Sequence, residues 1–160
     1  MKKILEAEKK VNAINLDSIL YTLVKRKGWT EWSMEKAKEI EKLYRYFLIL
    51  VISYPDKNIV PTKEIDTFWH THILDTEKYM EDCNNAFGYY VHHFPYFGLR
   101  GTTDEKIAKD SFLETCYLFK KHFDVSLLDN IARCSSHCRS ACGPKNTAID
   151  DQKNAYRPTL

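Results

Sequence analysis

The sequence predicts an all-α fold: a single-domain helical bundle of about five helices, with an aromatic-rich extended segment and an irregular C-terminal tail. The chain has 160 residues, of which 44% are hydrophobic and 29% are charged, as is usual for one globular domain with its own core. It contains only five glycines, so few turns can use positive φ and helices are favoured over a turn-rich β fold. Apolar residues also recur at helical spacing along much of the chain.

The first two expected helices cover residues 15–27 and a longer stretch that follows. Gly28 closes the first helix. The second begins at Thr30 and ends near Ser53, because the residue before Pro55 is pushed out of the α region. The C-terminal half of this long helix is apolar on all sides, which indicates a central position in the fold.

The third expected helix is continuous over residues 62–87 and ends at Gly88. At about 100° per residue, one face collects mainly apolar side chains, together with one histidine and one threonine: Ile65, Phe68, Trp69, His72, Thr76, Tyr79, Met80, Cys83 and Phe87. The aromatic-dense residues 89–98 are expected to be extended chain packed on the core.

Thr102 and Glu105 are spaced as a capping box that opens the fourth helix, and residues 126–132 are expected to add a short fifth one. The domain prediction is a helical domain over residues 1–133 and a flexible, cysteine-containing tail over residues 134–160. The net charge of +2, from 24 basic and 22 acidic residues, does not favour a nucleic-acid partner. No apolar stretch has the length of a signal peptide or a membrane span, so a cytoplasmic protein without membrane contact is expected.

Four of the six histidines lie within a short stretch, together with Asp66. Asp66 and His70 have the i, i+4 spacing by which a helix offers two ligands to one metal ion. His70 and His72 point about 200° apart on a helix, so they cannot readily bind the same ion. If the chain reverses at Gly88, an extended segment carries His92 and His93 back to the start of the third helix, with one of the two facing it.

Two interpretations of these residues remain open. In the first, Asp66 and His70 bind a divalent transition metal, zinc or iron, with His92 or His93, and a site centred on His72 is the variant. In the second, the histidines are structural. His72 would then be a core histidine bonded to Asp75, Tyr79 or a carbonyl, because buried polar groups are usually just satisfied. No nucleotide-binding or nucleophile motif is present.

One part of the sequence resembles a known family. This part is the block Ile65-Asp66-Thr67-Phe68-Trp69-His70-Thr71-His72-Ile73-Leu74-Asp75-Thr76, followed by Tyr79, Cys83, Phe87-Gly88 and His92-His93-Phe94-Pro95. It resembles the domain shared by plant glycine-rich domain proteins and their bacterial relatives, over roughly residues 15–100. The resemblance supports the helical fold and draws attention to Asp66, His70, His72, His92 and His93. It implies no reaction.

The tail contains a second candidate site, with Cys134, Cys138 and Cys142 at intervals of four residues and His137 beside them. Thiolates and imidazole suit Zn²⁺ or Cu(I), and neighbouring arginines would favour thiol reactivity. The sequence therefore leaves three functional hypotheses: a metal-binding helical domain, a module that binds a protein partner, and metal or redox chemistry in the tail. None of them names a reaction.

Overall fold

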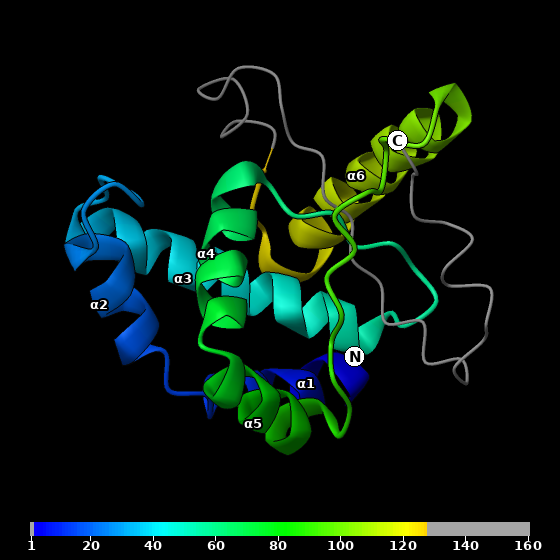
Figure 1. Cartoon of the computed structure of the whole chain (residues 1–160). Coiled ribbons are helices and arrows are strands. Elements are labelled where there is room, and N and C mark those ends of the chain that lie inside the picture. Colours follow the sequence, from blue (N-terminus) through cyan, green and yellow to red (C-terminus); the bar gives the residue numbers. More distant parts are fainter. Residues whose placement is uncertain (1, 128–160) are drawn as a thin grey trace.

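The structure is a computed structural model that describes residues 2–127, and in this part of the chain it is all-helical, as predicted. The described residues form six helices in a bundle (Figure 1): α1 Lys2–Asn12, α2 Asp17–Lys25, α3 Met34–Ser53, α4 Lys63–Leu74, α5 Thr76–Phe87 and α6 Thr102–Phe123. The short helix expected over residues 126–132 and the cysteine tail lie outside the described residues, apart from the first two positions of that helix.

Helix α3 is the centre of the bundle, as its apolar C-terminal half predicted. It packs against α1, α2, α4 and α6, while α5 packs against α1 and α4. Every side chain from Phe47 to Val51 is buried, so this stretch of α3 is enclosed on all sides. The helix starts at Met34 and not at Thr30, because the side chain of Ser33 accepts a hydrogen bond from the backbone N–H of Lys36 and caps the helix there.

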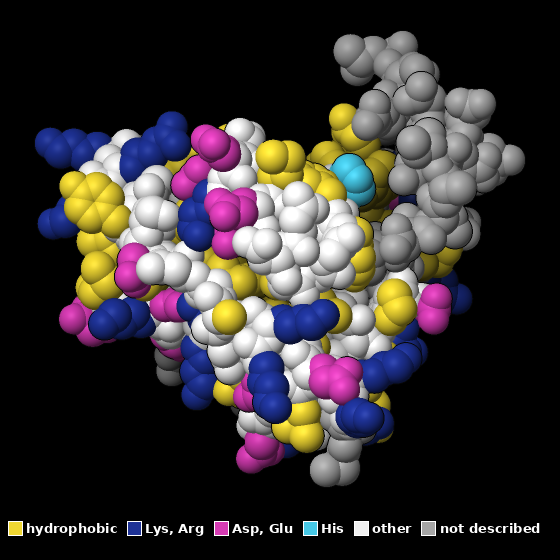
Figure 2. All heavy atoms as spheres, turned by 90° about the horizontal axis from the view of Figure 1, so that it is seen from below, with side chains coloured by type: hydrophobic (Ala, Val, Ile, Leu, Met, Phe, Trp, Pro, Cys, Tyr) yellow, Lys and Arg dark blue, Asp and Glu magenta, His cyan; other side chains and the backbone are white. Residues whose placement is uncertain are grey.

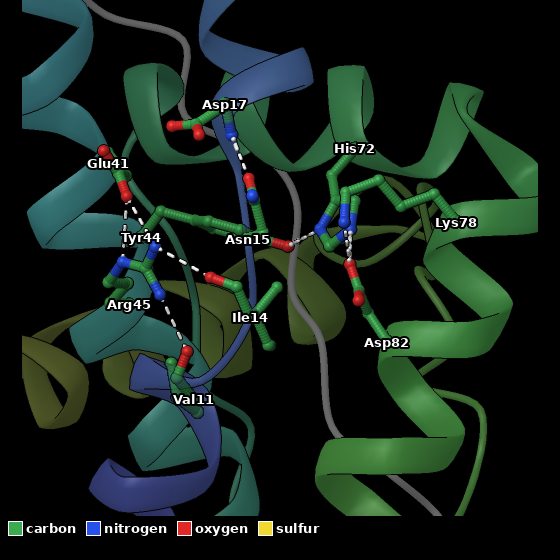
Figure 3. Close-up of polar contacts among 10 residues, drawn as sticks. All are labelled: Val11, Ile14, Asn15, Asp17, Glu41, Tyr44, Arg45, His72, Lys78 and Asp82. Atoms are coloured by element: carbon green, nitrogen blue, oxygen red, sulfur yellow. Dashed lines mark hydrogen bonds and ion pairs between the residues drawn. The ribbon is translucent and has the colours of Figure 1, made fainter.

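Helix α1 was not predicted, because few of its side chains reach the core. Only Ala7 and Val11 of this helix are buried, which leaves a weak apolar pattern in the sequence. A side chain of α3 completes its C-terminal end: Arg45 Nη1 donates to the carbonyl of Val11 at 2.7 Å, and Arg45 Nη2 donates to the carbonyl of Ile14 at 3.0 Å (Figure 3). A cation is favourable at this end of a helix.

The expected continuous helix over residues 62–87 is wrong, because the chain breaks into α4 and α5 at Asp75. Two hydrogen bonds, one buried and one partly buried, join residues that are ten positions apart: Trp69 Nε1 to the Tyr79 hydroxyl at 2.8 Å, and His72 Nε2 to Asp82 Oδ2 at 2.9 Å. In an unbroken helix such residues would be about 15 Å apart along the axis. The break turns α5 across the end of α4 (Figure 1) and leaves Thr76 and Met80 exposed rather than on the buried face.

The chain reverses after α5, as predicted. Gly88 takes a left-handed conformation with φ of 77° at the C-terminal end of α5, which costs glycine nothing. Residues 88–101, called the returning segment below, then run back alongside α4 as non-helical chain before α6 begins (Figure 1). Val91 and Phe97 are buried, so this segment packs on the core as expected from its aromatic composition.

The predicted capping box at the start of α6 is wrong. Thr102 is already helical, the N-cap position is Gly101, and no side chain caps it. Asp104 instead turns back to the preceding loop, where its Oδ2 accepts hydrogen bonds from the backbone N–H groups of Gly98 at 2.6 Å and of Arg100 at 3.2 Å. This carboxylate fastens the returning segment to α6.

On the face shown in Figure 2, Lys and Arg side chains alternate with Asp and Glu side chains, and no extended region carries charge of one sign. Among the described residues, no helix combines the length and the hydrophobicity that a membrane crossing requires.

Candidate metal centre

Three side chains from two parts of the chain converge beside the first turns of α4. His70 Nε2 lies 2.8 Å from His93 Nε2, and His93 Nε2 lies 3.0 Å from Asp66 Oδ1. His70 Nε2 also lies 3.7 Å from the other carboxylate oxygen of Asp66, Oδ2. These residues form the Asp-His-His cluster, whose potential ligand atoms all lie within 4.8 Å of one another.

The spacing of these atoms is close to that of ligands around one metal ion. Ligand atoms bonded to zinc at about 2.0 to 2.1 Å, at tetrahedral or octahedral angles, are about 3 to 3.4 Å apart. His93 Nε2 lies 2.8 Å from His70 Nε2 and 3.0 Å from Asp66 Oδ1, at the short end of this range, and His70 Nε2 lies 3.7 Å from Asp66 Oδ2, slightly beyond it. Small shifts of the side chains would therefore bring all three donors onto one ion.

Hydrogen bonding within the cluster is less favourable than its short distances suggest. A neutral imidazole nitrogen carries either one hydrogen or one lone pair, yet Nε2 of His93 faces both His70 Nε2 and Asp66 Oδ1. One hydrogen on this nitrogen cannot point straight at both partners. A cation between the three residues would use a lone pair of each.

The cluster is open on one side. The side chain of His70 is 45% exposed, whereas those of Asp66 and His93 are 18% and 9% exposed. Burial lowers the pKa of His70 from its ordinary value of 6.5, against the opposing effect of the Asp66 carboxylate. A lowered pKa favours the neutral imidazole, which is the form that binds a metal ion.

Local sequence explains how α4 presents its two members of the cluster. Pro61 precedes the helix, and the side chain of Thr62 caps it by accepting a hydrogen bond from the backbone N–H of Ile65. Asp66 and His70 then occupy the same side of the helix, one turn apart. Trp69, on the adjoining side, is completely buried in the core and fixes the rotation of α4 about its axis.

His72 lies on the other side of α4 and takes part in a different network. It is 1% exposed. Its Nδ1 is 2.9 Å from the hydroxyl of Tyr44, and its Nε2 is 2.9 Å from Asp82 Oδ2, which also accepts from Lys78 Nζ at 2.8 Å (Figure 3). His72 is thus buried, as the structural interpretation expected, but its hydrogen-bond partners are Tyr44 and Asp82 and not Asp75, Tyr79 or a carbonyl.

Neither hydrogen-bond partner of His72 could be identified from local sequence spacing. Tyr44 comes from α3, 28 positions away, and Asp82 comes within reach only because the helix breaks at Asp75. Burial lowers the pKa of His72, although Asp82 acts in the opposite direction. A neutral His72 that donates from Nε2 to Asp82 and accepts at Nδ1 from Tyr44 satisfies every polar atom of the ring.

The remaining sequence candidates do not join the cluster. His92 is exposed, and its ring lies against that of Tyr90, with 4.8 Å between the ring centroids. In extended chain neighbouring side chains point to opposite sides, so His93 faces α4 and His92 does not. Cys134, His137, Cys138 and Cys142 lie outside the described residues. The other two cysteines, Cys83 and Cys116, are buried free thiols.

The fold and the cluster together define a helical protein with two histidines and one carboxylate gathered beside a helix. The family model of UCP032817-like proteins matches residues 6–125. The chain therefore belongs to the UCP032817-like family.

This match overturns the resemblance to glycine-rich domain proteins. That resemblance depended mainly on the tryptophan–HxH block and the residues that follow it, whereas the family match begins within α1 and extends beyond α6. Comparisons with curated proteins and with solved structures found no match.

Proposed function

We propose that the protein binds one divalent transition metal ion, zinc or iron, through a carboxylate oxygen of Asp66 and the Nε2 atoms of His70 and His93. The convergence of these three donor atoms within 4.8 Å of one another is the observation that carries the proposal. Two imidazoles and one carboxylate are a ligand set that proteins use for both metals.

Three protein ligands leave coordination positions for water or a substrate. Structural zinc sites normally have four protein ligands, whereas catalytic zinc sites have three and keep a position open. The same two-histidine, one-carboxylate set with open positions is typical of iron(II) oxygenases. Because His70 is the most exposed of the three residues, the open positions lie on its side of the cluster, where solvent has access.

The test is the metal content of tag-free protein purified without chelator and measured by mass spectrometry. Wild type is compared with His70→Ala and His93→Ala, which each remove one proposed ligand. His92→Ala is the matched control, because it removes a histidine next to His93 in the chain that lies outside the cluster. A further variant that ends at residue 133 lacks the cysteine tail.

We expect close to one equivalent of zinc or iron in wild type, in His92→Ala and in the shortened variant, and a large loss in His70→Ala and His93→Ala. Metal that disappears only with the tail would assign the binding to Cys134, Cys138 and Cys142. Folded wild-type protein that takes up neither zinc nor iron(II), even when the ions are added, would contradict the proposal.

A second candidate function is binding of a protein partner, which the surface of α6 favours. Leu113 and Tyr117 lie one turn apart on this helix and are 58% and 61% exposed. Exposed apolar groups of this size often mark interaction surfaces when they form a patch. If this surface binds a protein partner, the wild type should sediment in cell extract as a complex larger than the protein alone. The variant in which both residues are replaced by Ser should sediment alone, and its metal content should equal that of the wild type.

A further inference from the structure

A buried chain of hydrogen bonds lies directly behind the Asp-His-His cluster. The indole N–H of Trp69 donates to the hydroxyl of Tyr79 at 2.8 Å, and this hydroxyl donates to the backbone carbonyl of Val91 at 2.7 Å. Trp69 and Tyr79 are 0% and 1% exposed. These two hydrogen bonds therefore link α4, α5 and the returning segment through the hydroxyl group of Tyr79.

The last of these hydrogen bonds ties the returning segment to α5 at Val91. Val91 is two positions before His93, and in extended chain residues two apart point to the same side. Val91 is completely buried, His93 is mostly buried and His92 is exposed. Holding the carbonyl of Val91 therefore keeps His93, and not His92, turned toward Asp66 and His70.

Trp69, the first donor in this series of hydrogen bonds, also contacts the Asp-His-His cluster itself. The rings of Trp69 and His93 are packed with their centroids 4.9 Å apart at an angle of 51°. Trp69 immediately precedes His70 in α4. The same indole thus supports the His93 ring with one surface and anchors the segment that carries His93 with its N–H group.

We propose that Trp69 and Tyr79 are positioning residues of the metal site, which hold His93 in place through the hydrogen-bond chain to Val91 and through ring packing. This inference rests on the proposed function, because it assigns to the two residues the geometry of the same site. Groups that orient metal ligands from behind typically contribute about 10- to 100-fold to metal affinity.

Tyr79→Phe tests this role, because it removes one hydroxyl and keeps the buried ring. Tyr44→Phe is the matched control. It also removes a hydroxyl from a fully buried tyrosine that contacts a histidine of α4, but that histidine is His72. The probe is Co²⁺, whose visible absorption reports both affinity and coordination geometry. The ring signals of His93 in NMR spectra of the metal-free protein provide a second readout.

We expect Tyr79→Phe to weaken Co²⁺ binding by about 10- to 100-fold, to alter the visible spectrum and to shift the His93 ring signals. Tyr44→Phe should keep the affinity, the spectrum and the His93 signals of the wild type. Equal effects of the two variants, or a Tyr79→Phe protein with wild-type affinity and spectrum, would overturn the inference.

Failure of the proposed function gives a different result from failure of this inference. If the wild type does not bind Co²⁺, the metal proposal fails, and the His93 signals of the metal-free variants still decide whether Tyr79 positions this residue. Unchanged His93 signals in Tyr79→Phe would then refute the positioning role by themselves.

Discussion

Two histidines on one helix have opposite surroundings in this protein. His72 is buried, and both of its ring nitrogens have a partner of suitable chemistry, the hydroxyl of Tyr44 and the carboxylate of Asp82. His70, two residues earlier, is 45% exposed, and its Nε2 faces a second imidazole nitrogen. The first arrangement is complete without a ligand, whereas the second gathers lone pairs that a cation would satisfy.

The comparison shows that the face of the helix, and not the residue type, decides what a histidine does here. Residues two apart on a helix point in nearly opposite directions, so the Trp69–HxH block sends one histidine into the core and one to the rim. Each histidine then meets the groups that its side of α4 provides. Replacing His72 should therefore mainly lower stability, whereas replacing His70 should mainly affect metal binding.

The largest expected effect on stability comes from His72→Ala. This change leaves the hydroxyl of Tyr44 and the carboxylate of Asp82 without their shared partner and opens a cavity, so we expect a loss of about 3 to 5 kcal/mol in the free energy of unfolding. Urea denaturation of metal-free protein measures it. His70→Ala, at a partly exposed site, should cost about 1 kcal/mol or less. Similar losses in the two variants would remove the distinction between the histidines.

Added metal should separate the two histidines further, because it should stabilise the folded protein only where His70 is present. An ion that binds only the folded protein stabilises it by about 2.7 kcal/mol when the free ion is at 100 times its dissociation constant. We expect this gain in thermal denaturation of wild type and of His92→Ala with added Zn²⁺. His70→Ala should gain almost nothing at the same concentration. A gain in His70→Ala equal to that of wild type would place the ion elsewhere.

A third effect, which depends on pH, concerns Asp104 at the far end of the returning segment. Like the ring of His72, its carboxylate has hydrogen-bond partners within the protein. Asp104 is buried, and burial is the largest single effect and raises its pKa. The hydrogen bonds from Arg100 and Gly98, together with the charge of Arg100, outweigh burial and bring the pKa below the ordinary value of 3.8. The unfolded chain therefore binds the proton more tightly, and the stabilisation by Asp104 is complete above about pH 5 and lost as the pH falls through 3.8 toward the pKa of the folded state.

Asp104→Asn should accordingly cost about 1.5 to 3 kcal/mol at pH 7 and progressively less below pH 4. Urea denaturation of wild type and variant across this range measures the difference. A cost that stayed constant down to pH 3 would show that the charge of Asp104 contributes nothing.

Much of the candidate site could be predicted from the sequence because its determinants are local. The i, i+4 spacing of Asp66 and His70 follows from helix geometry, and Gly88 marks the reversal that brings His93 back. The choice between His92 and His93 could not be predicted. It depends on which of the two faces α4, and this follows from contacts of the neighbouring Val91, which is buried and whose carbonyl accepts a hydrogen bond from Tyr79.

Other parts of the fold lacked a local signal. The break at Asp75 contains neither glycine nor proline and is stabilised by tertiary bonds from Trp69 to Tyr79 and from His72 to Asp82. Helix α1 has a mostly polar sequence, and its C-terminal end is completed by Arg45 of α3, over thirty positions away. Only a three-dimensional arrangement reveals such partners.

The short span of the hydrogen bonds around the cluster has a consequence for the order of folding. Those that join α4, α5 and the returning segment link residues 10 to 27 positions apart. Bonds from the region before α4 to α6 link residues 55 and 68 positions apart, between Val60 and Thr115 and between Tyr54 and His122. Local contacts generally close faster than distant ones. The elements around the candidate metal centre are therefore expected to assemble as one early unit, and α6 to dock after it.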